Sequence, residues 1–281
     1  MNNATTAQAQ PTGGKRGSSE ALDFSGALLF SRYAYPPNQL GYCGPDDAEA
    51  LLSAVSEQRS YGAVRSLARQ FTGAWPYLEL IAHSNGIADP LDRRVVEAYW
   101  VGNRALVQVS PKALGDSLIA RFETRLQRSS ELLTDPILTG GVLHHNFHVF
   151  AIYPWLGLMR AGSDHAPMSV LDRCRIRWGT VKEVSGDTAV VESRPLVFDG
   201  WRLGLGESQS ESVRFGIGGF GFQANGMPTE LAVGDAVSLH WDWICDRLGG
   251  TALANLRYLT AKNLAAVNAS PRPGPASVMG A

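Results

Sequence analysis

The hydrophobic pattern of the chain changes its period once, at residues 162–167. Before this point, apolar residues recur at helical spacing between turn signals such as Asn85-Gly86 and Asp135-Pro136. After it, apolar and polar residues alternate along short segments, which is typical of half-buried strands. Because a helix and a strand need different periods, the change predicts an α+β protein with a helical part followed by a strand-rich part.

Four regions follow from this pattern. Residues 1–21 are rich in Ala, Gln, Ser and Gly and lack the apolar core of a signal peptide, so we expect a disordered tail. Residues 22–165 are predicted to form an α-helical domain of unknown role. Residues 168–268 are predicted to form a small OB-like β-barrel with a C-terminal helix, because short strands with glycine turns favour a barrel. Residues 269–281, rich in Pro and Ser, are predicted to be a flexible tail.

Within these regions the pattern predicts individual elements. Helices are expected near residues 46–55, 61–71, 75–82, 92–106, 114–133, 147–159 and 251–266. Strands are expected from Arg173 to Trp178, on both sides of the turn Ser185-Gly186-Asp187, within Phe215 to Phe222, and from Val233 to Trp243. In the first of these strands, alternation places Cys174 on one face and the three arginines at 173, 175 and 177 on the other, solvated face.

The bulk composition narrows the class of protein. With 44% hydrophobic residues the 281-residue chain can form a real core, and its formal charge of -1 gives no field for holding a nucleic acid backbone. Three cysteines without a CxxC pair fit a reducing compartment. The longest apolar stretch, Val149–Met159, is too short to span a bilayer. We therefore expect a cytoplasmic protein with no membrane and no nucleic acid partner.

Two groups in the helical part are candidates for metal or thiol chemistry. Cys43 lies in a turn before a predicted helix start, where the helix dipole would lower its pKa, so it is a candidate metal ligand, although a buried structural thiol is the alternative. The run His144-His145-Asn-Phe-His148 places His144 and His148 on one face of a helix, a spacing that suits a metal. For these histidines we favour a structural role at a helix start.

Two short blocks stand out in the strand-rich part. The first is Cys174-Arg-Ile-Arg-Trp-Gly179 with the turn Gly186-Asp187, and the second is Val233-Gly-Asp-Ala-Val-Ser-Leu-His240 followed by a helix. In residue type and order, these blocks resemble the HypC/HybG/HupF family of NiFe hydrogenase maturation chaperones. The chain departs from the family in carrying the cysteine internally instead of at the N-terminus, and in having Trp178 where the family usually has proline.

The resemblance implies a function and a pair of site residues. Cys174 and His240 match the cysteine and histidine with which the family handles iron as Fe(CN)2CO, a transient cargo. Family members carry this group from a HypD-type maturation protein to the hydrogenase large-subunit precursor. A thiolate suits low-spin iron, and an imidazole is a weaker donor that can release it. His240 follows Val237 and Leu239, and we expect it to share their inward face.

The leading hypothesis is therefore a non-enzymatic maturation chaperone with an added helical domain. The alternative is an enzyme whose site lies in the helical part, at Cys43 or at His144 and His148, with the barrel as an accessory binding module. A third reading, nucleic acid binding through an OB-like barrel, lacks a basic patch interleaved with aromatic residues.

Overall fold

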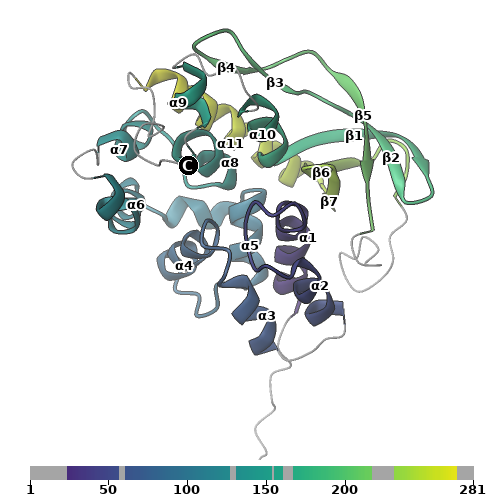
Figure 1. The fold of residues 1–281 in the computed structure, drawn as a ribbon, viewed down its shortest axis with the longest axis horizontal. Helices are drawn as coiled ribbons and strands as arrows, with labels where there is room; N and C mark the ends of the chain where they lie inside the picture. Colours follow the sequence, from purple (N-terminus) through teal and green to yellow (C-terminus); the bar gives the residue numbers. More distant parts are fainter. Residues whose placement is uncertain are drawn as a thin grey trace, which may run out of the picture.

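The computed structural model describes residues 24–56, 61–126, 131–153, 155–160, 167–216 and 231–270. Helices occupy one side of the molecule and strands the other (Figure 1). The helices are α1 (Ser25–Gln39), α2 (Ala48–Ser56), α3 (Tyr61–Ala68), α4 (Trp75–Ser84), α5 (Arg93–Trp100), the 3-10 helix η1 (Arg104–Gln108), α6 (Pro111–Leu126), α7 (Glu131–Leu138), α8 (His145–Phe147), the π-helix η2 (His148–Ile152), α9 (Trp155–Arg160), α10 (Pro167–Cys174) and α11 (Gly250–Ala269). The strands are β1 (Arg177–Ser185), β2 (Thr188–Ser193), β3 (Leu196–Phe198), β4 (Leu203–Leu205), β5 (Gln209–Arg214), β6 (Ala236–His240) and β7 (Trp243–Arg247).

These elements confirm the α+β class, with a helical N-terminal part and a sheet-rich C-terminal part. Five strands pair in the order β1-β2-β5-β7-β6, and β6 pairs back with β1, so the ladder closes on itself. The pairing is antiparallel except where β5 meets β7 through the parallel pair Arg214 and Trp243. The predicted hairpin at Ser185-Gly186-Asp187 is confirmed, and β3 and β4 form a separate hairpin between β2 and β5.

Helix α1 was not predicted from the sequence, because Pro36 and Pro37 lie inside it. The structure buries Arg32, Tyr33 and Tyr35 of this helix. Helix α1 packs against α2, α5, β6 and β7, and this tertiary burial outweighs the low helix propensity of proline.

Two expectations about the strands are wrong. Cys174 is the last residue of α10, so the first strand begins only at Arg177. The expected strand from Val233 to Trp243 is divided in two, because Trp241 adopts a left-handed backbone with φ of 52° between β6 and β7. A left-handed residue cannot continue an extended strand.

Several predicted features fall outside the described residues. They are the N-terminal tail, most of the domain boundary at residues 162–167, most of the expected strand from Phe215 to Phe222, and most of the C-terminal tail. The division into two domains stays a prediction. Within the described part of the chain, no helix is long and apolar enough to cross a bilayer.

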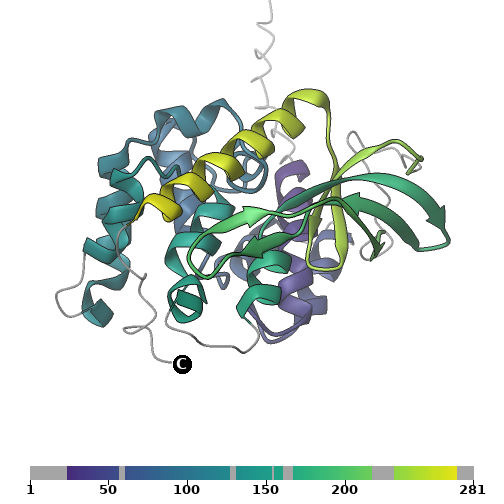
Figure 2. The same cartoon turned by 90° about the horizontal axis from the view of Figure 1, so that it is seen from above.

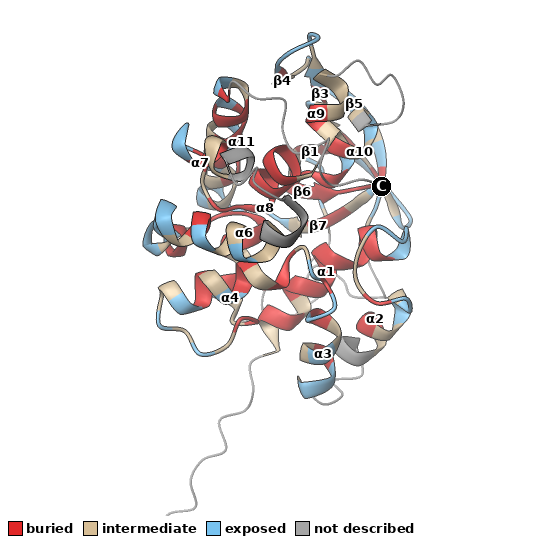
Figure 3. Cartoon of the chain, turned by 60° about the vertical axis from the view of Figure 1, so that its left-hand side comes forward, coloured by how far each residue is buried: buried red, intermediate tan, exposed pale blue. Residues whose placement is uncertain are grey.

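The main hydrophobic core is shared by both parts of the chain. One cluster of buried side chains contains residues of α1, α4, α5, α8 and α11 together with Ile176, Trp241 and Cys245. A smaller cluster fills the inside of the closed ladder, with Val181, Val213 and Ile244 among its members. Figure 2 shows how α11 leaves the strands and runs back across the helices, and Figure 3 shows buried residues gathered where α1, α8 and β6 meet.

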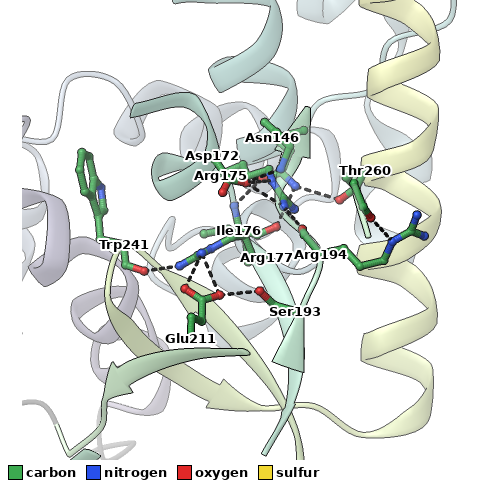
Figure 4. Close-up of polar contacts among 12 residues, drawn as sticks. Asn146, Asp172, Arg175, Ile176, Arg177, Ser193, Arg194, Glu211, Trp241 and Thr260 are labelled. Carbon is green, nitrogen blue, oxygen red and sulfur yellow. Dashed lines mark hydrogen bonds and ion pairs between the residues drawn. The ribbon is translucent and has the colours of Figure 1, made fainter. Parts of the chain in front are cut away.

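Arg175 and Arg177 are buried in a polar network and do not lie on the solvated face that alternation predicted (Figure 4). Arg175 forms an ion pair with Asp172 at 3.0 Å. Arg177 forms an ion pair with Glu211 at 2.8 Å, and its second amino group donates a hydrogen bond to the carbonyl oxygen of Trp241. These charges are tolerated in the interior because each has an anionic or carbonyl partner. Arg173 alone keeps a half-exposed side chain.

This network gives a test of the fold. Glu211→Ala would leave the Arg177 guanidinium buried without its anion, so we expect the free energy of unfolding to fall by about 3 kcal/mol. Glu192→Ala on the neighbouring strand is the matched control, because Glu192 is exposed and pairs with Lys182 at the surface. Urea unfolding of both variants measures the difference. Equal stabilities for the two variants would contradict the proposed importance of the buried pair.

Candidate metal centre

Three side chains with metal-ligand chemistry meet where the helical and sheet-rich parts join. His145 begins α8, Cys174 ends α10, and His240 ends β6. One ligand atom from each lies within 4.8 Å of the others. The three residues are 6%, 7% and 0% exposed. Two imidazoles and one thiol with no carboxylate suit zinc, copper or iron better than magnesium or calcium.

A buried amide fixes two of these residues relative to each other. The side-chain carbonyl of Asn146 accepts a hydrogen bond from the backbone N–H of Ile176 at 2.7 Å. Its amide nitrogen donates to the carbonyl oxygen of Ile176 at 3.0 Å and to the hydroxyl of Thr260 at 2.9 Å (Figure 4). Since Asn146 follows His145 and Ile176 lies two residues after Cys174, these bonds hold α8 beside the end of α10.

His240 is oriented by a backbone carbonyl of α1. Its Nδ1 lies 2.6 Å from the carbonyl oxygen of Tyr33. A carbonyl only accepts, so Nδ1 carries the hydrogen and Nε2 carries a lone pair. That Nε2 is buried and has no hydrogen-bond partner. Histidines that bind metals commonly donate their other N–H to a carbonyl in this way, so His240 has the form of a ligand.

His145 has hydrogen bonds on both sides of its ring. Its Nε2 lies 2.8 Å from the carbonyl oxygen of Cys174, and its Nδ1 lies 3.2 Å from the hydroxyl of Tyr99. Binding a metal requires the ring to exchange one of these bonds for a coordinate bond. His145 is therefore expected to be a weaker ligand than His240, whose lone pair is free.

Burial sets the protonation of all three residues. It lowers the pKa of His145 to about 4, although the Cys174 carbonyl partly opposes this, and it holds the pKa of His240 well below the usual value. Both rings are neutral at pH 7 and can coordinate without losing a proton. Burial raises the pKa of the Cys174 thiol far above its usual value. Metal binding must therefore release the thiol proton.

Trp241 closes the turn directly after His240. Its backbone N–H donates to the carbonyl oxygen of Arg173 at 2.7 Å, which ties it to the residue before Cys174. The ring of Tyr42 stacks on its indole with centroids 4.4 Å apart. Trp241 is thus held by the chain segments next to both Cys174 and His240.

The structure brings together the two residues that the family resemblance singled out, Cys174 and His240. It corrects the face of His240: Val237 and Leu239 point into the ladder, while His240 alternates with them and faces α1 with Ser238. The third member, His145, was not among the predicted ligands. The sequence showed it as part of a histidine run, but only the fold reveals which histidine of that run faces Cys174.

The remaining histidine candidates have structural partners. His144 caps the start of α8, where its Nδ1 accepts a hydrogen bond from the backbone N–H of Asn146 at 3.1 Å. The predicted role at a helix start is therefore confirmed for His144. His148 lies 3.0 Å from the hydroxyl of Tyr77 through Nδ1 and packs against the ring of Tyr153. Neither residue belongs to the group of ligand atoms around Cys174.

Cys43 differs from its prediction. The helix dipole was expected to lower its pKa, but burial raises it to about 12. The start of α2 is instead satisfied by the carboxylate of Asp47, which accepts hydrogen bonds from the backbone N–H groups of Glu49 and Ala50. Cys43 lies outside the group formed by His145, Cys174 and His240.

An α+β fold with a buried site of two imidazoles and a thiol defines a candidate metal-binding protein. The chain belongs to the DUF6390 family, a family of unknown function whose model matches residues 22–273. No curated protein and no solved structure matches the chain.

The buried histidines predict a loss of stability in mild acid. Burial lowers the pKa of His144 to about 3 and of His145 to about 4, and it holds the pKa values of His148 and His240 well below the usual value. The unfolded chain therefore takes up protons first as the pH falls below about 6.5. Each histidine then lowers the free energy of unfolding by about 1.4 kcal/mol per pH unit until its folded-state pKa is reached.

Urea unfolding at about pH 7.5 and pH 5.5 measures this loss, because the two values lie on either side of the ordinary histidine pKa. His145→Asn should reduce the pH dependence of the free energy of unfolding by the contribution of one histidine. His83→Asn is the matched control for replacing a histidine, since His83 is exposed on α4. A wild-type protein equally stable at both pH values would contradict the assignment of neutral buried rings.

Proposed function

We propose that this protein is a metallocentre-assembly protein that handles iron at the site formed by Cys174, His240 and His145. The observation that carries the proposal is that the sequence and the fold point to the same two residues. Cys174 and His240 were selected from the sequence by their resemblance to the HypC/HybG/HupF family, without reference to their separation in space. In the fold their ligand atoms lie within 4.8 Å of each other in the interior.

The chemistry of the site supports a metal over a purely structural role. A buried nitrogen without a hydrogen-bond partner is costly to a fold. The Nε2 atoms of His144, His148 and His240 are all of this kind, and of these three residues it is His240 that belongs to the ligand group. A metal coordinated by the Nε2 of His240 would satisfy it. The thiolate of Cys174 is a soft donor that suits low-spin iron, and the neutral imidazoles complete a three-donor set with room for other ligands on the metal.

By this proposal the cargo is iron as Fe(CN)2CO, and the partners are a HypD-type maturation protein and a hydrogenase large-subunit precursor. The closed five-stranded ladder and α11 support the OB-like barrel with a C-terminal helix that the resemblance implies. The chain differs from the family in one respect that bears on transfer. His145 comes from the helical part, so the iron would be held between the two parts of the chain and not on the barrel alone.

Metal binding by the isolated protein is the first test. We expect one Co2+ to bind with the absorption of a thiolate-coordinated ion and with release of about one proton. Cys174→Ala should abolish that absorption, and His240→Gln and His145→Ala should each weaken binding by more than about tenfold. Cys245→Ala is the control, because Cys245 is a second fully buried free thiol outside the ligand group. Loss of the absorption in Cys245→Ala but not in Cys174→Ala would show that Cys245, and not Cys174, is the thiolate ligand.

Co-expression with a HypD-type protein tests the cargo. We expect a complex with infrared bands of iron-bound cyanide and carbon monoxide, and we expect these bands to be lost in Cys174→Ala. His240→Gln should keep its melting temperature near that of the wild type but weaken iron retention and hydrogenase maturation. Normal maturation by a folded His240→Gln protein would falsify the role of His240. A protein that binds Co2+ but gives no complex would instead retain the metal site and reject the hydrogenase partners.

A further inference from the structure

The carbonyl that orients His240 is free because of a proline. In an α-helix the carbonyl of each residue accepts a hydrogen bond from the N–H four residues later. For Tyr33 in α1 that residue is Pro37, which lies inside the helix. Proline has no N–H, and its ring pushes against the carbonyl four residues before it. The Tyr33 carbonyl therefore lacks the partner that an α-helix normally supplies four residues later.

The interior supplies the missing partner from the sheet. Tyr33 is fully buried, so water does not solvate its carbonyl, and an unpaired buried carbonyl is unfavourable. The Nδ1–H of His240 donates to it at 2.6 Å. The side chain of Tyr33 secures the same contact, because its hydroxyl lies 2.7 Å from the hydroxyl of Ser238 on β6. Helix α1 is thus fixed to β6 through both the backbone and the side chain of one residue.

The bond determines which nitrogen of His240 is available to a metal. With the hydrogen held on Nδ1, the lone pair stays on Nε2, the atom that lacks a partner. If residue 37 carried an N–H, it would compete for the Tyr33 carbonyl. The bond that fixes the tautomer and the ring orientation of His240 would then weaken, which normally lowers metal affinity.

We propose that Pro37 is a positioning residue for the metal site, because it reserves the Tyr33 carbonyl for His240. This inference rests on the proposed metal site but not on hydrogenase as the partner. Pro36 provides the comparison within the same helix turn. By the same spacing it frees the carbonyl of Arg32, whereas His240 bonds to that of Tyr33.

The test compares Pro37→Ala with Pro36→Ala in the full chain. Either change removes a proline from the helix interior, so neither should lower the melting temperature. Pro37→Ala should weaken Co2+ binding by about tenfold or more, as loss of an outer hydrogen bond to a ligand does. Pro36→Ala should bind Co2+ as the wild type does. Equal Co2+ affinities for the two variants, whether both normal or both reduced, would overturn the proposal.

A second measurement needs no metal. Nitrogen-15 NMR of the histidine rings reports the tautomer of His240 directly. We expect the Nδ1–H form in the wild type and in Pro36→Ala, and a mixture with the Nε2–H form in Pro37→Ala. An unchanged tautomer in Pro37→Ala would also overturn the proposal. If the wild type binds no Co2+, the metal site of the proposed function fails, while the NMR comparison still decides whether Pro37 controls the ring.

Discussion

The hydrogen bond between His240 and the carbonyl of Tyr33 is the constraint on which the candidate site depends. It crosses from the sheet to α1 and lies in the core that the two parts share. This single hydrogen bond offsets two costs. One is the cost of an unpaired buried carbonyl, and the other is the cost of a buried imidazole with an unpaired N–H. The same contact leaves the Nε2 of His240 without a hydrogen-bond partner, and His240 belongs to the candidate ligand group with His145 and Cys174, so one bond serves both the fold and the candidate site.

Much of the architecture was predictable because periodicity is a local property. The helical part, the hairpin at Gly186 and the final helix α11 follow from spacing alone. Helix α1 did not, since its prolines argue against a helix and its packing against α2, α5, β6 and β7 supports it. The arginines at 175 and 177 were misplaced for a related reason. Arg175 lies between the end of α10 and the start of β1, where alternation does not apply. Arg177 is the first residue of β1, and it shares the buried face of Gly179 and Val181.

The residues of the candidate site also differ in whether local sequence could identify them. Cys174 and His240 stand in short blocks that a resemblance can recognise. His145 stands in a run of histidines whose members have three different surroundings: a helix cap, a ligand group and a tyrosine contact. Which ring faces the thiol depends on Asn146 and its bonds to Ile176 and Thr260. Those bonds join segments far apart in the chain, and one sequence contains no sign of them.

Trp241 is a bulky residue in a backbone conformation that suits glycine. Its left-handed φ of 52° costs about 1 to 3 kcal/mol for a residue other than glycine. Glycine would relieve that strain but would remove the indole on which Tyr42 stacks beside His240. The residue at this position is therefore a compromise between an unstrained turn and the stacking of Tyr42 on the indole. Relatives that carry glycine there should have an unstrained turn without this stacking, and relatives that keep an aromatic residue should retain both the strain and the contact.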